Sequence, residues 1–202
     1  MKRLFFVVAF VLIGQMYGMA QSNRAKFGLS ITPLANANVL NTQGILGGAS
    51  YDWKSSIAFG LTYVQPINNW LDFESGFDVS KHKFLVTALT HPDEIYSSTR
   101  NSTILSIPIT LRINFLKYFF VNGGGLFSIS PSTDDSALDQ QGLGLMAGFG
   151  ANFNLKSGFS IFVNPYSKFH ALINFPAEKG DNYRINENGI RIGVTYTIPS
   201  NY

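Results

Sequence analysis

The sequence predicts an all-β fold: a single antiparallel transmembrane β-barrel of about eight strands, preceded by a cleavable signal peptide. Three observations predict it. The chain starts with a short leader of the export type, the remainder alternates apolar and polar residues almost throughout, and the connections between alternating segments are short and long in turn. We therefore divide the chain into a signal peptide, residues 1–20, and an outer-membrane β-barrel domain, residues 21–202.

The leader has the three parts of a signal peptide. Lys2 and Arg3 form a positive start, residues 4–13 are an unbroken apolar run, and the small residues Gly18 and Ala20 precede the expected cleavage point. A membrane-spanning helix needs about 20 apolar residues, roughly twice the length of this run. Removal of the leader after residue 20 is therefore favoured over a permanent anchor.

The composition favours strands over membrane helices. Hydrophobic residues make up 46% of the chain and aromatic residues 14%, whereas charged residues make up only 13%, about half the usual share of a soluble domain. Mean hydropathy is nevertheless only +0.10, too low for a bundle of apolar helices. The net charge of +3 is too small to indicate nucleic-acid binding. The absence of cysteine excludes disulfides and thiolate metal sites.

Alternation with a period of two carries the prediction of strands. Residues 142–155 place leucine, alanine and phenylalanine on one face and mainly glycine and asparagine on the other. In a soluble sandwich or a lipocalin-like barrel the apolar face would point inward. Here the candidate inner face is the glycine-rich one, and a water-soluble core built mainly from glycine would pack badly. We expect strands near residues 26–35, 55–66, 70–84, 103–116, 118–130, 141–155, 158–172 and 188–199.

The connections fall into two alternating classes. Those after the second, fourth and sixth strands are very short, whereas the others are longer and polar, for example around residues 91–94, 132–136 and 178–182. Outer-membrane barrels place short turns in the periplasm and long loops outside. Aromatic residues near the short turns predict a girdle at the periplasmic interface: Trp70, Phe115, Tyr118, Phe119, Phe120, Phe153, Phe159, Tyr196 and Tyr202.

Two stretches of the chain resemble small OmpX-like outer-membrane barrels of the PorT type. They are residues 59–76, which include FGLTYVQPI, and residues 106–125, which include SIPITL and FFVNGGG; Ser106 stands where family members often carry glutamate. The ending GVTYTI at residues 193–198 is similar to the signal read by the barrel-assembly machinery. The resemblance implies an integral outer-membrane protein whose partners are membrane lipids and, during insertion, that machinery. Some relatives assist secretion, and others are adhesins or resistance proteins.

Charged residues on the polar face predict an interior ion-pair network. Three acidic and three basic residues are expected to point inward: Asp72, Glu74, Asp78, Arg112, Lys168 and Arg191. Buried charges need partners, and eight strands enclose a space that side chains can fill. We interpret the network as structural, plugging the lumen. The alternative interpretation of the same residues is a gate or a small-ion path.

The remaining motifs predict no catalytic, cofactor or metal site. His170 is expected to face inward beside Lys168, with serines such as Ser128 near it, but no spacing joins them into a triad. The glycine-rich segments match neither a dinucleotide-binding motif nor a phosphate-binding loop. We therefore expect a non-enzymatic barrel with a structural, adhesive or partner-binding role through its long external loops. The alternative is an accessory component of transport or protein secretion, with secretion or surface partners.

Overall fold

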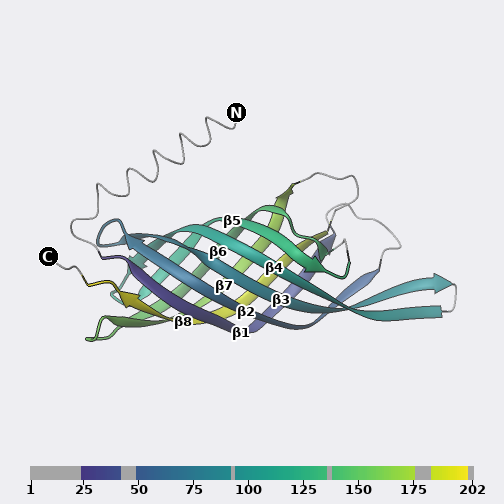
Figure 1. Ribbon diagram of the computed structural model, residues 1–202, viewed down its shortest axis with the longest axis horizontal. Coiled ribbons are helices and arrows are strands. Elements are labelled where there is room, and N and C mark those ends of the chain that lie inside the picture. Colours follow the sequence, from purple (N-terminus) through teal and green to yellow (C-terminus); the bar gives the residue numbers. More distant parts are fainter. Residues whose placement is uncertain (1–23, 42–48, 92–93, 136–137, 176–182, 200–202) are drawn as a thin grey trace, which may run out of the picture.

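The computed structural model describes residues 24–41, 49–91, 94–135, 138–175 and 183–199. These residues form a closed barrel in which each strand is antiparallel to its neighbours and β1 pairs with β8 (Figure 1). The predicted all-β fold with eight strands is confirmed, whereas the predicted signal peptide and Tyr202 lie outside the described residues. The strands are β1 (Lys26–Asn41), β2 (Ser50–Pro66), β3 (Leu71–His91), β4 (Glu94–Phe115), β5 (Phe119–Thr133), β6 (Gly142–Asn154), β7 (Phe159–Asn174) and β8 (Tyr183–Thr197).

One end of the barrel carries three tight turns, as the sequence predicted. Residues 67–70, 116–118 and 155–158 join β2 to β3, β4 to β5 and β6 to β7, and we call this end the short-turn rim and the opposite end the outer rim. Leu116 and Lys117 have φ values of 48° and 68°, the left-handed geometry that tight hairpin turns use. The first and last described residues lie at the same end (Figure 1).

The third and fourth strands are longer than the sequence predicted. The segment around His91 was expected to be a polar loop, but β3 and β4 stay paired from Lys83 opposite Asn101 out to Leu89 opposite Ile95. Beyond Thr87 on β3 and before Ser102 on β4, this pair continues as a two-stranded ribbon, residues 88–91 and 94–100, which extends beyond the other strands (Figure 1). Its threonines and tyrosine favour strands, but its residues do not alternate between apolar and polar, which is the pattern on which the prediction rested.

The outward face is apolar, as the alternation predicted. Leu145, Phe149, Leu29 and Val194 are among its exposed side chains. At the short-turn rim seven of the predicted girdle residues are exposed: Trp70, Phe115, Tyr118, Phe119, Phe153, Phe159 and Tyr196. A large unbroken apolar surface of this kind is stable only when lipid covers it.

Phe120 corrects the predicted girdle. Its side chain is only 1% exposed and points into the barrel, because successive residues of a strand face opposite sides and Phe119 faces outward.

Among the described residues, no helix has the length and apolar character needed to cross a membrane.

Candidate functional site: the barrel interior

Near the short-turn rim, the interior is crossed by an ion-pair group that we call the Glu74 cluster: Glu74, Arg112 and Arg191. Glu74 on β3 accepts a 2.5 Å hydrogen bond from Arg191 on β8 and lies 3.7 Å from Arg112 on β4. Asn164 on β7 accepts a second bond from Arg191 at 2.8 Å. Charged side chains from three strands therefore meet inside the barrel.

Aromatic rings support both guanidinium groups. The guanidinium carbon of Arg112 lies 3.5 Å from the ring centre of Phe120, and that of Arg191 lies 5.5 Å from the centre of Phe162. A cation over a ring face is attracted by the ring's negative charge distribution, more strongly where water is excluded. Gly150 and Gly193 make room for the rings, since a Cβ at either position would lie 2.5 Å from a ring carbon.

Further from the short-turn rim lies a second group, the Glu187 cluster: Asp78, Lys168, Glu187, Tyr166, His82 and His170. Lys168, only 1% exposed, donates to Asp78 at 2.9 Å and lies 3.5 Å from Glu187. Glu187 also accepts a bond from the Tyr166 hydroxyl at 2.5 Å. The buried ammonium thus has two carboxylates around it, which offset the cost of taking it out of water.

Two histidines approach the same carboxylate. Nε2 of His82 lies 3.1 Å and Nε2 of His170 lies 3.5 Å from Glu187 Oε2. On their other side, Nδ1 of His82 is 2.7 Å from Ser56 Oγ, and Nδ1 of His170 is 2.9 Å from Ser128 Oγ. This serine–histidine–carboxylate order resembles that of a hydrolytic triad. Ser128 and His170 are fully buried, so the Ser128 hydroxyl has no solvent access, whereas Ser56 is half-buried and its hydroxyl accepts a 2.8 Å hydrogen bond from Nε1 of Trp53.

At the outer rim the interior is closed by an apolar cluster: Ala37, Phe84, Ile104, Leu138 and Ile185. Leu138 comes from the connection between β5 and β6, which was expected to be an external loop. Ser102 donates to its carbonyl at 3.2 Å. The neighbouring Gln140 is fully buried, accepts from the Ile185 amide and donates to the Tyr183 carbonyl. Part of this connection therefore folds back into the barrel.

Tyr51 fixes the same connection from the side. It lies on β2 beyond the apolar belt and donates to Asp135 at 3.1 Å. Burial, and then the negative charge of Asp135, raise the pKa of Tyr51, so its hydroxyl stays protonated and remains a donor.

The structure brings five of the six predicted interior residues into the two clusters. Asp72 lies apart, near the short-turn rim, where it accepts a 2.8 Å hydrogen bond from Asn114. Glu187 was missed because the eighth strand was expected to begin at residue 188, whereas β8 begins at Tyr183. Two steps of two residues back from the inward-facing Arg191 reach residue 187, so an earlier strand start would have found it.

Comparisons with known proteins identify the fold. No protein-family model matches the chain, and no curated protein sequence matches it at a significant level. Among solved structures, the outer membrane protein OprG from Pseudomonas aeruginosa is similar with a TM-score of 0.55 and 13% identity, over 88% of this chain and 96% of that one.

Two further structures have the same architecture. Ail, the attachment invasion locus protein of Yersinia pestis, has a TM-score of 0.50 and 14% identity over 86% of this chain and 99% of that one. The outer membrane protein AlkL has a TM-score of 0.50 and 11% identity over 91% and 94%. These identities establish fold alone. The chain has the fold of the small outer-membrane β-barrels, and its apolar outer belt suits that membrane.

Proposed function

We propose that this protein is an integral outer-membrane barrel without enzymatic activity, which binds surface partners through segments beyond its outer rim. The observation that carries the proposal is a filled interior combined with a ribbon, residues 88–91 and 94–100, that continues past the barrel. The adhesive or partner-binding role belongs to that ribbon.

The filled interior argues against a diffusion pore. The Glu74 cluster, the Glu187 cluster and the apolar cluster around Leu138 occupy successive levels of the lumen. Side chains can fill a barrel of eight strands completely. Activity is therefore expected on surfaces outside the lumen.

The ribbon has the chemistry of a binding edge. Among the described residues, 94–100 of β4 pair only with β3, because pairing of β4 with β5 begins at Ser102. An unpaired strand edge offers amide and carbonyl groups to another extended segment. The side chains of Ile95 and Tyr96 are 69% and 57% exposed, which adds apolar contact area beside that edge.

Crosslinking in native outer membranes, followed by mass spectrometry, tests the proposal. The informative variant replaces residues 88–97 with a two-residue turn, which shortens the ribbon and leaves every interior cluster in place. A second variant, Ile95→Ser with Tyr96→Ser, keeps the strand edge and removes only the exposed apolar groups, so it separates the contribution of the edge from that of the side chains. We expect the shortened variant to fold and to lose crosslinked partners.

Two results would contradict the proposal. One is an unchanged partner set from the shortened variant, with the barrel folded as judged by its heat-dependent mobility on gels. The other is recovery of secretion components through the short-turn rim alone, which would favour the accessory role in transport or secretion.

A further inference from the structure

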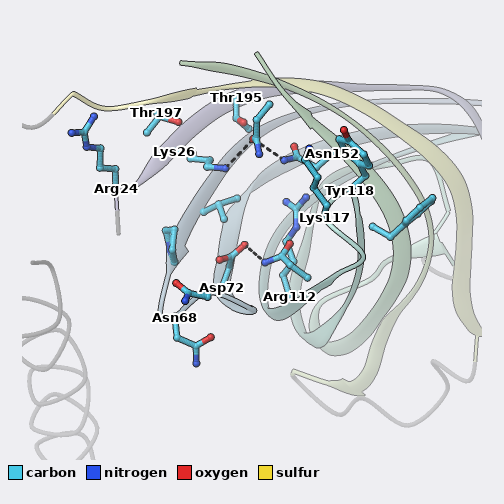
Figure 2. A pocket seen from close by; sticks show the side chains of 16 residues that line it. Arg24, Lys26, Asn68, Asp72, Arg112, Lys117, Tyr118, Asn152, Thr195 and Thr197 are labelled. Carbon is cyan, nitrogen blue, oxygen red and sulfur yellow. Dashed lines mark hydrogen bonds between the residues drawn. The ribbon is translucent and has the colours of Figure 1, made fainter. Parts of the chain in front are cut away.

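A cavity of about 460 Å³ opens at the short-turn rim, and Arg112 of the Glu74 cluster is part of its lining (Figure 2). Four cationic side chains and one carboxylate line it: Arg24, Lys26, Arg112, Lys117 and Asp72. Four positive charges and one negative charge leave the cavity with an excess of three positive charges. Its volume lies within the range of about 300–1,000 Å³ that small-molecule sites occupy.

The remaining lining is rich in neutral hydrogen-bond donors. Amide and hydroxyl side chains surround the cations on several strands and turns: Asn68, Asn69, Asn114, Asn152, Asn154, Thr195 and Thr197. Amide NH₂ groups and hydroxyls donate to oxygen acceptors. The cavity therefore combines positive charge with donors, the combination that recognises oxyanions.

Arg112 supplies the strongest indication of a ligand. Its side chain is only 5% exposed, its ion pair with Glu74 is long at 3.7 Å, and its Nε has no hydrogen-bond partner among the described residues. A guanidinium carries five N–H donors, and a buried donor left unsatisfied is costly. An acceptor placed in the cavity beside this guanidinium would give it a closer charged partner than Glu74 does.

The two lysines are also available to a ligand. Lys26 donates a weak 3.4 Å bond to Asn154, and the ammonium of Lys117 lies 5.2 Å from the ring centre of Tyr118. Among the described residues, neither ammonium lies within ion-pair distance of a carboxylate. Lys117 stands on a turn with left-handed backbone geometry, which non-glycine residues adopt at a cost in free energy.

We propose that this cavity binds a small oxyanion with two or more negative charges, of phosphate or carboxylate chemistry. Two or three charges on the ligand match the excess of the cavity, whereas a monovalent anion would leave most of it uncompensated. Asp72, held by Asn114, occupies part of the same space as a built-in counter-charge. The proposal concerns the short-turn rim and is independent of the role of the ribbon.

Calorimetric titration of the folded barrel with pyrophosphate tests the site, in micelles of an uncharged detergent at low salt. The loss variant is Lys26→Gln with Lys117→Gln. Its control is Lys81→Gln with Lys83→Gln, which removes the same charge from exposed positions far from the cavity. We expect the loss variant to weaken binding about a hundredfold, since each lost charge-assisted hydrogen bond costs roughly tenfold in affinity, and the control to leave it unchanged.

Asp72→Asn should strengthen pyrophosphate binding, so this variant tests the site through a gain in affinity. Removing the built-in carboxylate leaves a larger positive excess, so pyrophosphate should bind about tenfold more tightly. Absence of binding by the wild type at millimolar pyrophosphate would overturn the proposal. So would equal weakening by the two lysine double variants, or an unchanged affinity in Asp72→Asn.

The source of the oxyanion is resolved by repeating the titration in lipid nanodiscs. If a lipid headgroup occupies the cavity, discs that contain phosphatidic acid, whose phosphomonoester carries up to two negative charges, should weaken pyrophosphate binding relative to discs of phosphatidylcholine, and Lys26→Gln with Lys117→Gln should abolish that difference. If the ligand is a free solute, the two lipids should give the same affinity. Either result supports the oxyanion site, and a lipid effect that survives in the double variant contradicts it.

Discussion

The ammonium of Lys168 on β7 and the carboxylate of Asp78 on β3 form a 2.9 Å ion pair across the barrel interior, although 90 positions separate them in the chain. Both side chains are buried. Glu187 lies 3.5 Å from the same ammonium. Stability therefore depends on this lysine more than on any exposed one, because its removal leaves two acidic groups facing each other without a cation.

Replacing Lys168 with methionine should lower the free energy of unfolding by about 3–5 kcal/mol, the usual cost of breaking a buried pair from one side. Urea unfolding in micelles, followed by tryptophan fluorescence, measures the change. Lys81→Met at an exposed position is the control and should have little effect. Adding Asp78→Asn to Lys168→Met should recover part of the loss, and a loss below about 1 kcal/mol would contradict the role given to the pair.

Adding one methyl group at Gly193 should destabilise the barrel. A Cβ there would lie 2.5 Å from the ring of Phe162 and 2.7 Å from the backbone oxygen of Leu29, so Gly193→Ala should cost about 1–3 kcal/mol as overpacking does. Gly125→Ala is the matched control, since a Cβ at that position has no heavy atom within 4 Å. Equal stabilities of the two variants in urea would show that the ring does not depend on this glycine.

The wild-type barrel should show no large stable conductance in planar bilayers. Three obstacles occupy successive levels of the lumen: the Glu74 cluster, the Glu187 cluster and the apolar cluster around Leu138. Leu138→Gly alone should therefore stay closed, and so should the same change combined with serine at positions 74, 112 and 191, because the Glu187 cluster still fills the lumen. Stable conductance by the wild type would favour the ion-path interpretation of the interior charges.

Alkaline pH should loosen the contact between Tyr51 and Asp135. Because the pKa of Tyr51 is raised above its ordinary value of 10.0, the hydroxyl contributes stability that is present below pH 10 and is lost as pH rises toward the raised pKa. The wild type should lose more stability than Tyr51→Phe between about pH 9 and pH 11.5. Tyr96→Phe, at an exposed position on the ribbon, should follow the wild type, and identical pH profiles of wild type and Tyr51→Phe would contradict the assignment.

The sequence predicted the barrel wall well because lipid and lumen impose a strict alternation on each strand. Leu143 and Leu145 face outward, whereas Gly142 and Gly144, which alternate with them, lie on the inner face. The same rule set the inward direction of Glu74, Arg112 and Arg191. Where that constraint ends, the prediction fails: the ribbon around Leu89 and Ile95 is a paired strand that shows no such alternation.

Contacts between distant strands could not be predicted in the same way. Residue spacing gives the height of a side chain on its own strand, but which groups meet across the lumen depends on the tilt and stagger of the closed sheet. His82 and His170 illustrate this, since they lie 88 positions apart and meet at Glu187. The inward fold of Leu138 was missed as well, because a single leucine in a polar connection has no periodic pattern around it.

Closure of the seam between β1 and β8 carries a consequence for biogenesis. Arg191 on β8 pairs with Glu74 on β3, 117 positions away, and Lys168 on β7 pairs with Asp78, also on β3. While the sheet is still open, these charges lack their partners, and exposing them to hydrocarbon would be costly. The interior charges are therefore neutralised only when the cylinder closes. An incomplete sheet would pay a free-energy cost for entering lipid, whereas the closed barrel would not.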